Sequence, residues 1–176
     1  MKVNIKKSGN GPLSNLKYTK VVKFGIPKTT TVRPKEDDDD DKDPLTNADI
    51  LAIMEAGSIR MNIPARKLLE PVVNKHEDKI REMFKLIFDA LLSGNVSQAD
   101  MLMERLALRV ETWTKSYFTE DNNWTPNAPI TVHGGWMINK VSGKPVYIKG
   151  KGSDQPLIDT GELRKAIKGL VVDRDS

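Results

Sequence analysis

The sequence contains no cysteine among its 176 residues. Disulfides, thiolate nucleophiles and cysteine-based zinc or iron–sulfur sites are therefore excluded. No uninterrupted apolar run approaches the about 18 residues that a membrane-spanning helix needs, so we expect no membrane span. The basic residues 1–7 are not followed by the apolar block that is typical of a signal peptide. Aromatic residues make up only 6% of the chain. Because there are only two histidines, few sites are available for acid–base catalysis by histidine.

Composition and charge nevertheless indicate a folded chain with two unusual segments. Apolar residues make up 38% of the sequence and charged residues 30%, enough for one modest core at this length. The net charge of +4 is unevenly distributed, because residues 1–36 carry +8 and residues 37–49 carry −6. A basic arm followed by an acidic run is typical of segments that face a partner. A solvated tail and loop would give the same pattern.

Residues 1–45 are predicted to form a basic N-terminal arm or hairpin followed by an acidic loop. Apolar and polar residues alternate in residues 3–6, which is the period of a strand. A second extended run, residues 18–24, is interrupted by Lys20 and Lys23, and a Gly/Pro/Asn-rich connector separates the two runs. Five consecutive aspartates at residues 37–41 repel one another and favour a loop. This run lacks the alternating ligands and central glycine of a calcium loop, so it does not predict a metal site.

A short helix is predicted from residue 46 to residue 57. Thr46 offers an N-cap, Asp49 an acidic first turn and Gly57 a stop. A second, longer helix is expected to open at residues 63–66 and to stop at residues 93–95. Pro71 is expected either to bend its start or to delay the regular helix to Val72. Its apolar stripe, at spacings of three and four, consists of Leu69, Val72, Val73, Ile80, Met83, Phe84, Ile87 and Leu91.

A third helix is predicted to start at Ser97, where Asp100 completes a near capping box. A connector of about four residues joins it to the second helix, so the two are expected to pack as an antiparallel hairpin that forms the core. The apolar stripe of the third helix consists of Leu102, Leu106, Val110, Trp113 and Tyr117. Met103 also lies on this stripe, and Leu108 lies only partly on it.

The residues after 120 predict short strands and one more helix. Residues 146–148 are a strand candidate, and residues 170–172 are expected to add a strand to the N-terminal sheet. Residues 159–162 are expected to cap a last helix that buries Leu163, Ala166 and Ile167. The predicted fold class is α+β: a central antiparallel helical hairpin packed with a small, mostly antiparallel sheet, with long peripheral loops. Residues 46–176 are expected to form a single domain of this kind.

The sequence offers no converging set of catalytic groups. It has neither a Walker loop nor a Gly-x-Ser-x-Gly elbow. His76 lies on or beside an apolar helix stripe, which favours a structural histidine over a catalytic one. His133 precedes two glycines and invites comparison with an oxyanion hole, but no nucleophile motif accompanies it. We therefore expect a protein that is not an enzyme and that needs no cofactor or metal.

The remaining signals concern partners. Trp124 and Trp136 lie in loop-like sequence, where an aromatic side chain either anchors a protein interface or folds back over the core. Trp113 belongs to a helix stripe and is expected in the core. The lysines of the arm, interleaved with Tyr18 and Phe24, also suit nucleic-acid phosphates. A basic nucleic-acid-binding accessory protein is therefore the alternative function, although no recognition motif is present.

Three segments follow one another in a distinctive order: residues 53–57 (IMEAG), 63–69 (IPARKLL) and 156–167 (PLIDTGELRKAI). In this order they resemble the tail-completion or neck proteins of long-tailed bacteriophages, including minor tail and virion-morphogenesis relatives. Those proteins carry a Glu-x-Gly helix end, an Ile-Pro-x-Arg helix start and a Leu-x-x-Thr-Gly-x-Leu segment before a late helix. Trp136 and Lys140 fit the Trp and Lys found before the last segment. The likeness spans residues 46–172.

This resemblance implies a structural virion protein of the head–tail junction, assembled in the cytoplasm of the bacterial host. It implies a homo-oligomeric ring that caps the tail end and docks onto the head connector, with tail-terminator or tail-tube proteins as further neighbours. It implies no membrane partner, and any DNA in the ring lumen would be bound without sequence specificity.

The lysine arm and the aspartate run depart from the family pattern, and we hypothesise that they contact neighbouring subunits or the adjacent ring. The candidate interface residues are Lys17, Lys20, Lys23, Asp37, Asp38, Asp39, Asp40, Asp41, Trp124 and Trp136.

Overall fold

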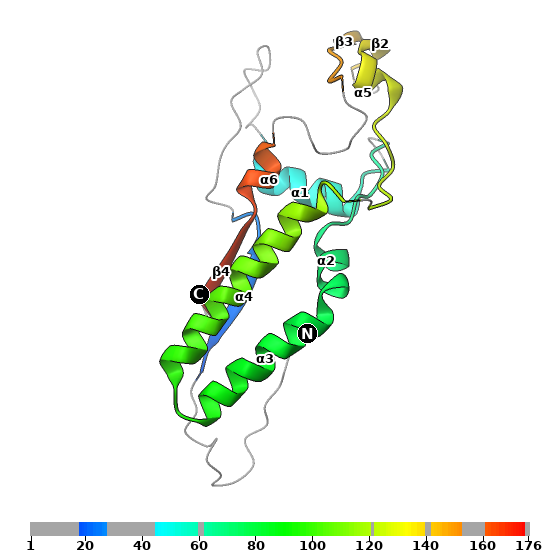
Figure 1. Cartoon of the computed structure of the whole chain (residues 1–176). Coiled ribbons are helices and arrows are strands. Elements are labelled where there is room, and N and C mark those ends of the chain that lie inside the picture. Colours follow the sequence, from blue (N-terminus) through cyan, green and yellow to red (C-terminus); the bar gives the residue numbers. More distant parts are fainter. Residues whose placement is uncertain are drawn as a thin grey trace. The chain divides into compact units, whose positions relative to one another are not determined.

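The computed structural model describes residues 18–27, 45–59, 62–120, 122–139, 142–152 and 161–174. Within these ranges the chain forms an α+β structure with two small antiparallel sheets. The elements, labelled in Figure 1, are β1 (Lys20–Gly25), α1 (Asn47–Ala56), α2 (Leu69–Lys75), α3 (Glu77–Leu92), α4 (Val96–Tyr117), α5 (Pro129–His133), β2 (Gly135–Ile138), β3 (Pro145–Ile148), α6 (Glu162–Ala166) and β4 (Lys168–Asp173).

The chain divides into two compact units, each assembled from separate segments. Of the described residues, those within 18–25, 70–113 and 168–174 belong to unit 1, and the others belong to unit 2. Strand β1, which comes from the predicted N-terminal arm, belongs to the same unit as the central helices.

Unit 1 is built on the helical hairpin of α3 and α4, as the sequence predicts. The connector turns at Gly94 with a φ of 73°, and Asn95 then caps α4 by accepting a hydrogen bond from the Gln98 amide at 3.1 Å. Asn95 therefore takes the capping role that we assigned to Ser97 and Asp100. The buried core of unit 1 consists of Met83, Ile87, Ala90, Leu91, Ala99, Met103, Leu106 and Val110.

Strands β1 and β4 pair in antiparallel fashion beside this hairpin, which confirms the strand predicted at residues 170–172 (Figure 1). Val22 is opposite Val171, and both pack against the core with Phe24. The approach of β4 to α4 is close, since a Cβ on Gly169 would collide with the backbone of Ala107. The other predicted strand of the N-terminal hairpin, residues 3–5, lies outside the described residues.

Unit 2 contains α1 packed against α6. The predicted start and stop of α1 are confirmed: Thr46 and Asp49 form a capping box, and Gly57 ends the helix with a φ of 68°. A side chain at Gly57 would strike the backbone of Ala65, so the close approach as well as the positive φ requires glycine. The predicted inward residues of the late helix are buried: Leu163, Ala166 and Ile167.

The predicted long second helix is wrong in its first part. Residues 64–68 are irregular, α2 begins at Leu69, and a turn at His76 separates α2 from α3. Directly before this segment, Ile63 forms an isolated antiparallel bridge with Ser58. Pro71 lies at the third position of α2, where its missing N–H costs no helical hydrogen bond.

Candidate interaction surfaces

Two of the segments that carry the family resemblance, residues 53–57 and 63–69, are joined by hydrogen bonds inside unit 2. Glu55, near the end of α1, accepts hydrogen bonds from the amides of Leu68 at 2.7 Å and Leu69 at 2.9 Å. These amides lie at the start of α2, where no helical carbonyl is available to them. Glu55 thus acts as a cap supplied from another helix.

Arg66 is buried, with 7% of its surface exposed. Its guanidinium donates to the carbonyl of Thr125 from Nε at 3.1 Å and from Nη2 at 3.0 Å, and its own amide donates to Met54 O at 2.7 Å. Burial lowers the pKa of Arg66 from its usual value. The side chain ties the irregular segment after residue 122 to the segment that precedes α2.

Trp124 belongs to this same internal assembly. Its Nε1 donates to Lys67 O at 3.0 Å, and its ring meets Tyr117 and Phe118 edge-on at centroid distances of 5.7 and 5.8 Å. Of the two aromatic candidates, Trp124 therefore has its ring and its N–H engaged within unit 2.

Trp136, the other candidate, lies on the β2–β3 hairpin and is 71% exposed. The register places Trp136 opposite Tyr147 and Ile138 opposite Pro145, so these side chains share one face. The rings of Trp136 and Tyr147 meet at 5.4 Å in an edge-on pair. Ile138 is 60% and Tyr147 57% exposed, so we define the exposed hairpin face as Trp136, Ile138, Tyr147 and Pro145.

The base of this hairpin is fixed by backbone contacts to α5. The amides of Lys151 and Gly152 donate to the carbonyls of Thr131 and Val132 at 2.9 and 3.0 Å. Gly134 and Gly150 approach so closely that a Cβ on either would meet the other's backbone. Trp136 was among the interface residues predicted from the sequence, whereas Ile138 and Tyr147 were not. The signal was present in the alternation of residues 136, 138, 145 and 147 across two short strands.

The predicted lysine arm is described only in part. Lys17 and Asp37, Asp38, Asp39, Asp40 and Asp41 lie outside the described residues. Lys23 is exposed on β1. Lys20, the third lysine of the candidate set, is paired within unit 1.

Lys20 binds Asp100 on α4, with Nζ 2.7 Å from Oδ2. The Tyr18 hydroxyl donates to Asp100 Oδ1 at 2.8 Å. Hydrogen bonds from Lys20 and Tyr18 hold the pKa of Asp100 below its ordinary value, and the bond to Asp100 raises the pKa of Lys20. Burial, and then the bond to Asp100, raise the pKa of Tyr18. This triad fastens β1 to α4.

The helices of unit 1 also expose apolar side chains that were predicted to lie on their buried stripes. Phe84 is 44% exposed and Leu108 62% exposed, so both stripe assignments are wrong. Phe84, Phe88 and Leu92 follow at spacings of four along α3 and form an exposed ridge on one flank of it. The period identified the helix correctly, but the two-stranded sheet and α4 cover only part of its wide apolar stripe.

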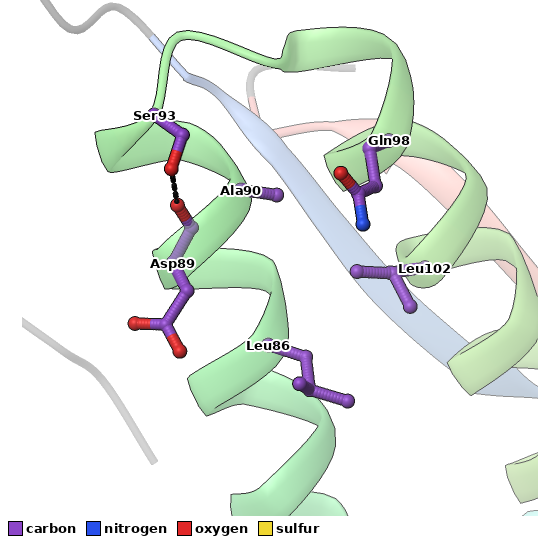
Figure 2. A pocket seen from close by; sticks show the side chains of 6 residues that line it. All are labelled: Leu86, Asp89, Ala90, Ser93, Gln98 and Leu102. Atoms are coloured by element: carbon purple, nitrogen blue, oxygen red, sulfur yellow. Dashed lines mark hydrogen bonds between the residues drawn. The ribbon is translucent and has the colours of Figure 1, made fainter.

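A shallow pocket of about 240 Å³ lies between α3 and α4 near their connector (Figure 2). Figure 2 shows Leu86 and Leu102 extending toward one another from the two helices. The remaining lining residues are Asp89, Ala90, Ser93 and Gln98, and the Ser93 hydroxyl donates to Asp89 O at 2.8 Å. The lining offers no pair of groups placed for acid–base or nucleophilic chemistry.

The two histidines have different surroundings. His76 stacks on Trp113 with ring centroids 4.1 Å apart and an interplanar angle of 15°. It therefore has a packing role at the α2–α3 turn. His133 is exposed at the end of α5.

Over the described ranges, His, Asp and Glu side chains form no group of three that would hold a metal ion. None of the helices in the described part of the chain combines the length and the apolar character needed to cross a bilayer.

Comparison of the chain with protein-family models, with curated proteins and with solved structures gives no match. Its function is therefore inferred from its own residues.

Proposed function

We propose that this protein is a structural, non-catalytic component of the head–tail junction of a long-tailed bacteriophage. In this role its copies form a ring that caps the tail end and joins it to the head connector. The order of the three segments, residues 53–57, 63–69 and 156–167, supports the proposal. The contacts that the first two segments make with each other inside unit 2 also support it. Glu55 and Arg66 build the scaffold of unit 2 rather than a reactive site.

The observation that carries the proposal furthest is the exposed hairpin face. Large apolar side chains exposed as a contiguous group mark surfaces that bind other proteins. Trp136, Ile138 and Tyr147 are all more than half exposed on a hairpin whose base is tied to α5. A two-stranded hairpin has little stability of its own, so a partner that covers this face would also order it.

Quantitative mass spectrometry of purified virions tests the proposal, with the portal and the major tail protein as internal references. We expect a small, fixed copy number per particle, as a ring requires. A protein that is produced during infection but absent from finished virions would overturn the proposal.

The same hairpin supports a second candidate function, which is binding to nucleic acid. Lys144, Lys149 and Lys151 flank two aromatic rings, and lysines beside exposed aromatics suit single-stranded nucleic acid. This function predicts binding to arbitrary DNA that falls steeply as salt rises, whereas a neck protein shows only weak binding. A salt titration of the isolated protein with labelled DNA distinguishes the two.

A further inference from the structure

The exposed hairpin face is apolar at its centre and basic around it. Residues 122–152 contain four lysines and one histidine and no aspartate or glutamate. Lys144 adjoins β3 at one end and Lys149 at the other, so positive charge brackets the strand that carries Tyr147. A surface of this kind selects a partner that combines negative charge with apolar groups.

The chain itself contains a segment with this chemistry. Residues 36–43 carry seven carboxylates and one lysine, and they are followed by Pro44 and Leu45. Leu45 is described and is 56% exposed, which places an accessible apolar side chain directly after the acidic segment. The basic hairpin and the acidic segment are therefore complementary in both charge and apolar character.

We infer that the β2–β3 hairpin of one copy binds the acidic segment, residues 36–43, of a second copy. The inference rests on the proposed function, because a ring needs each copy to present two different, complementary surfaces. The lysines attract the carboxylates, and Leu45 of the second copy packs on the exposed hairpin face.

The contact is small and its strength depends on salt. Stable interfaces bury about 800 Å² on each partner, which is more than four side chains on one hairpin supply. Each contact is therefore weak alone, and closing the ring adds further contacts. Because the screening length is about 10 Å at 0.1 M salt, association is expected to weaken as salt rises.

Charge reversal in the full-length protein tests the inference. The first variant is K144E/K149E/K151E, and the second replaces the five aspartates of residues 37–41 with lysine. A control, K85E/R105E/R109E, makes the same charge change as the first variant at exposed positions on α3 and α4. Circular dichroism and melting temperature show whether each variant is folded.

Sedimentation velocity at low salt measures self-association. We expect the self-association constant to fall at least about tenfold in each hairpin or segment variant, equivalent to about 1.4 kcal/mol, and to be unchanged in the control. A one-to-one mixture of the two variants is expected to associate again, because the acidic hairpin of the first now meets the basic segment of the second. Recovery in the mixture supports contact between copies.

Four other results overturn the inference. The first is a hairpin variant that self-associates as strongly as the wild type, and the second is a control variant whose self-association falls by the same factor. The third is a mixture of the two variants that does not associate again. The fourth is a wild-type protein that stays monomeric while its hairpin variant loses DNA binding. Virion copy number is measured separately, so the two proposals fail in distinguishable ways. If the chain is present in virions but its self-association does not change when the hairpin charges are reversed, only the inference is refuted. Recovery in the mixture with no chain in virions refutes only the proposed function.

Discussion

At the scale of single residues, Arg66 shows how the chain satisfies a buried charge without a carboxylate. It is the one charged residue that is buried within the described ranges, and its guanidinium donates to the carbonyls of Thr125 and Pro126 and to the sulfur of Met54. Carbonyl oxygens leave the positive charge unneutralised, but the planar fork of arginine reaches two of them at once. The sequence placed Arg66 in a helix start, and only tertiary structure reveals its acceptors.

Replacing Arg66 with alanine is expected to destabilise the protein. The substitution removes charge-assisted hydrogen bonds and frees the segment after residue 122, so the free energy of unfolding should fall by about 2–4 kcal/mol. Urea denaturation measures this loss. R66K is expected to be intermediate, and R164A, at an exposed position on α6, to have little effect. Equal stability of R66A and R164A would contradict the assigned role.

Asp100 gives a prediction about pH. Its pKa is held below the ordinary value, so its bonds to Lys20 and Tyr18 contribute stability at neutral pH. That contribution is lost as the pH falls below the ordinary aspartate pKa of about 3.9 and the carboxylate is protonated. D100N is therefore expected to melt a few degrees below wild type at pH 7, with the gap closing in acid. Melting curves from pH 7 to pH 2 test this, with E82Q as control. A gap that stays constant with pH would exclude the ion pair as its cause.

At the scale of elements, the fit of β4 against α4 depends on Gly169. Its amide donates to Glu111 Oε2 at 2.9 Å, and there is no room for a Cβ beside Ala107. G169A is expected to lower the free energy of unfolding by about 1–3 kcal/mol, because it forces the strand away from the helix. Thermal or urea denaturation gives the value. L170A, at a neighbouring residue that is 44% exposed, is the comparison, and it is expected to cost clearly less.

Elements with local signals were predictable from the sequence, and those determined by distant contacts were not. The capping box of α1, the turn at Gly94 and the α3–α4 hairpin follow from caps, glycines and helical period. The sequence predicts a helix over residues 64–68. In the structure, however, Glu55 caps the start of α2 at Leu68 and Leu69, and Arg66 donates to carbonyls nearly 60 positions away. Such tertiary bonds override local preference and leave no pattern in a single sequence.

At the scale of the whole molecule, the candidate site was predicted in part. An aromatic residue in loop-like sequence has two possible fates, and this chain contains both: Trp124 bonds to Lys67 O, whereas Trp136 is 71% exposed. Composition does not separate them, because the difference lies in whether a carbonyl and two aromatic rings are close by. The lysine-rich, carboxylate-free character of residues 122–152 is readable from the sequence, and the structure adds the apolar face that it surrounds.

The pairing of β1 with β4 has a consequence for the time course of folding. It joins residues that are far apart along the chain, with Thr19 and Asp173 separated by 154 positions. On the ribosome, β1 and the α3–α4 hairpin emerge well before their last strand exists. During this interval Val22 and Phe24 lack Val171, which packs against the same core in the folded protein. Pairings of such high sequence separation form slowly, so we expect the closing of this ribbon to be a late event that follows synthesis of residue 173.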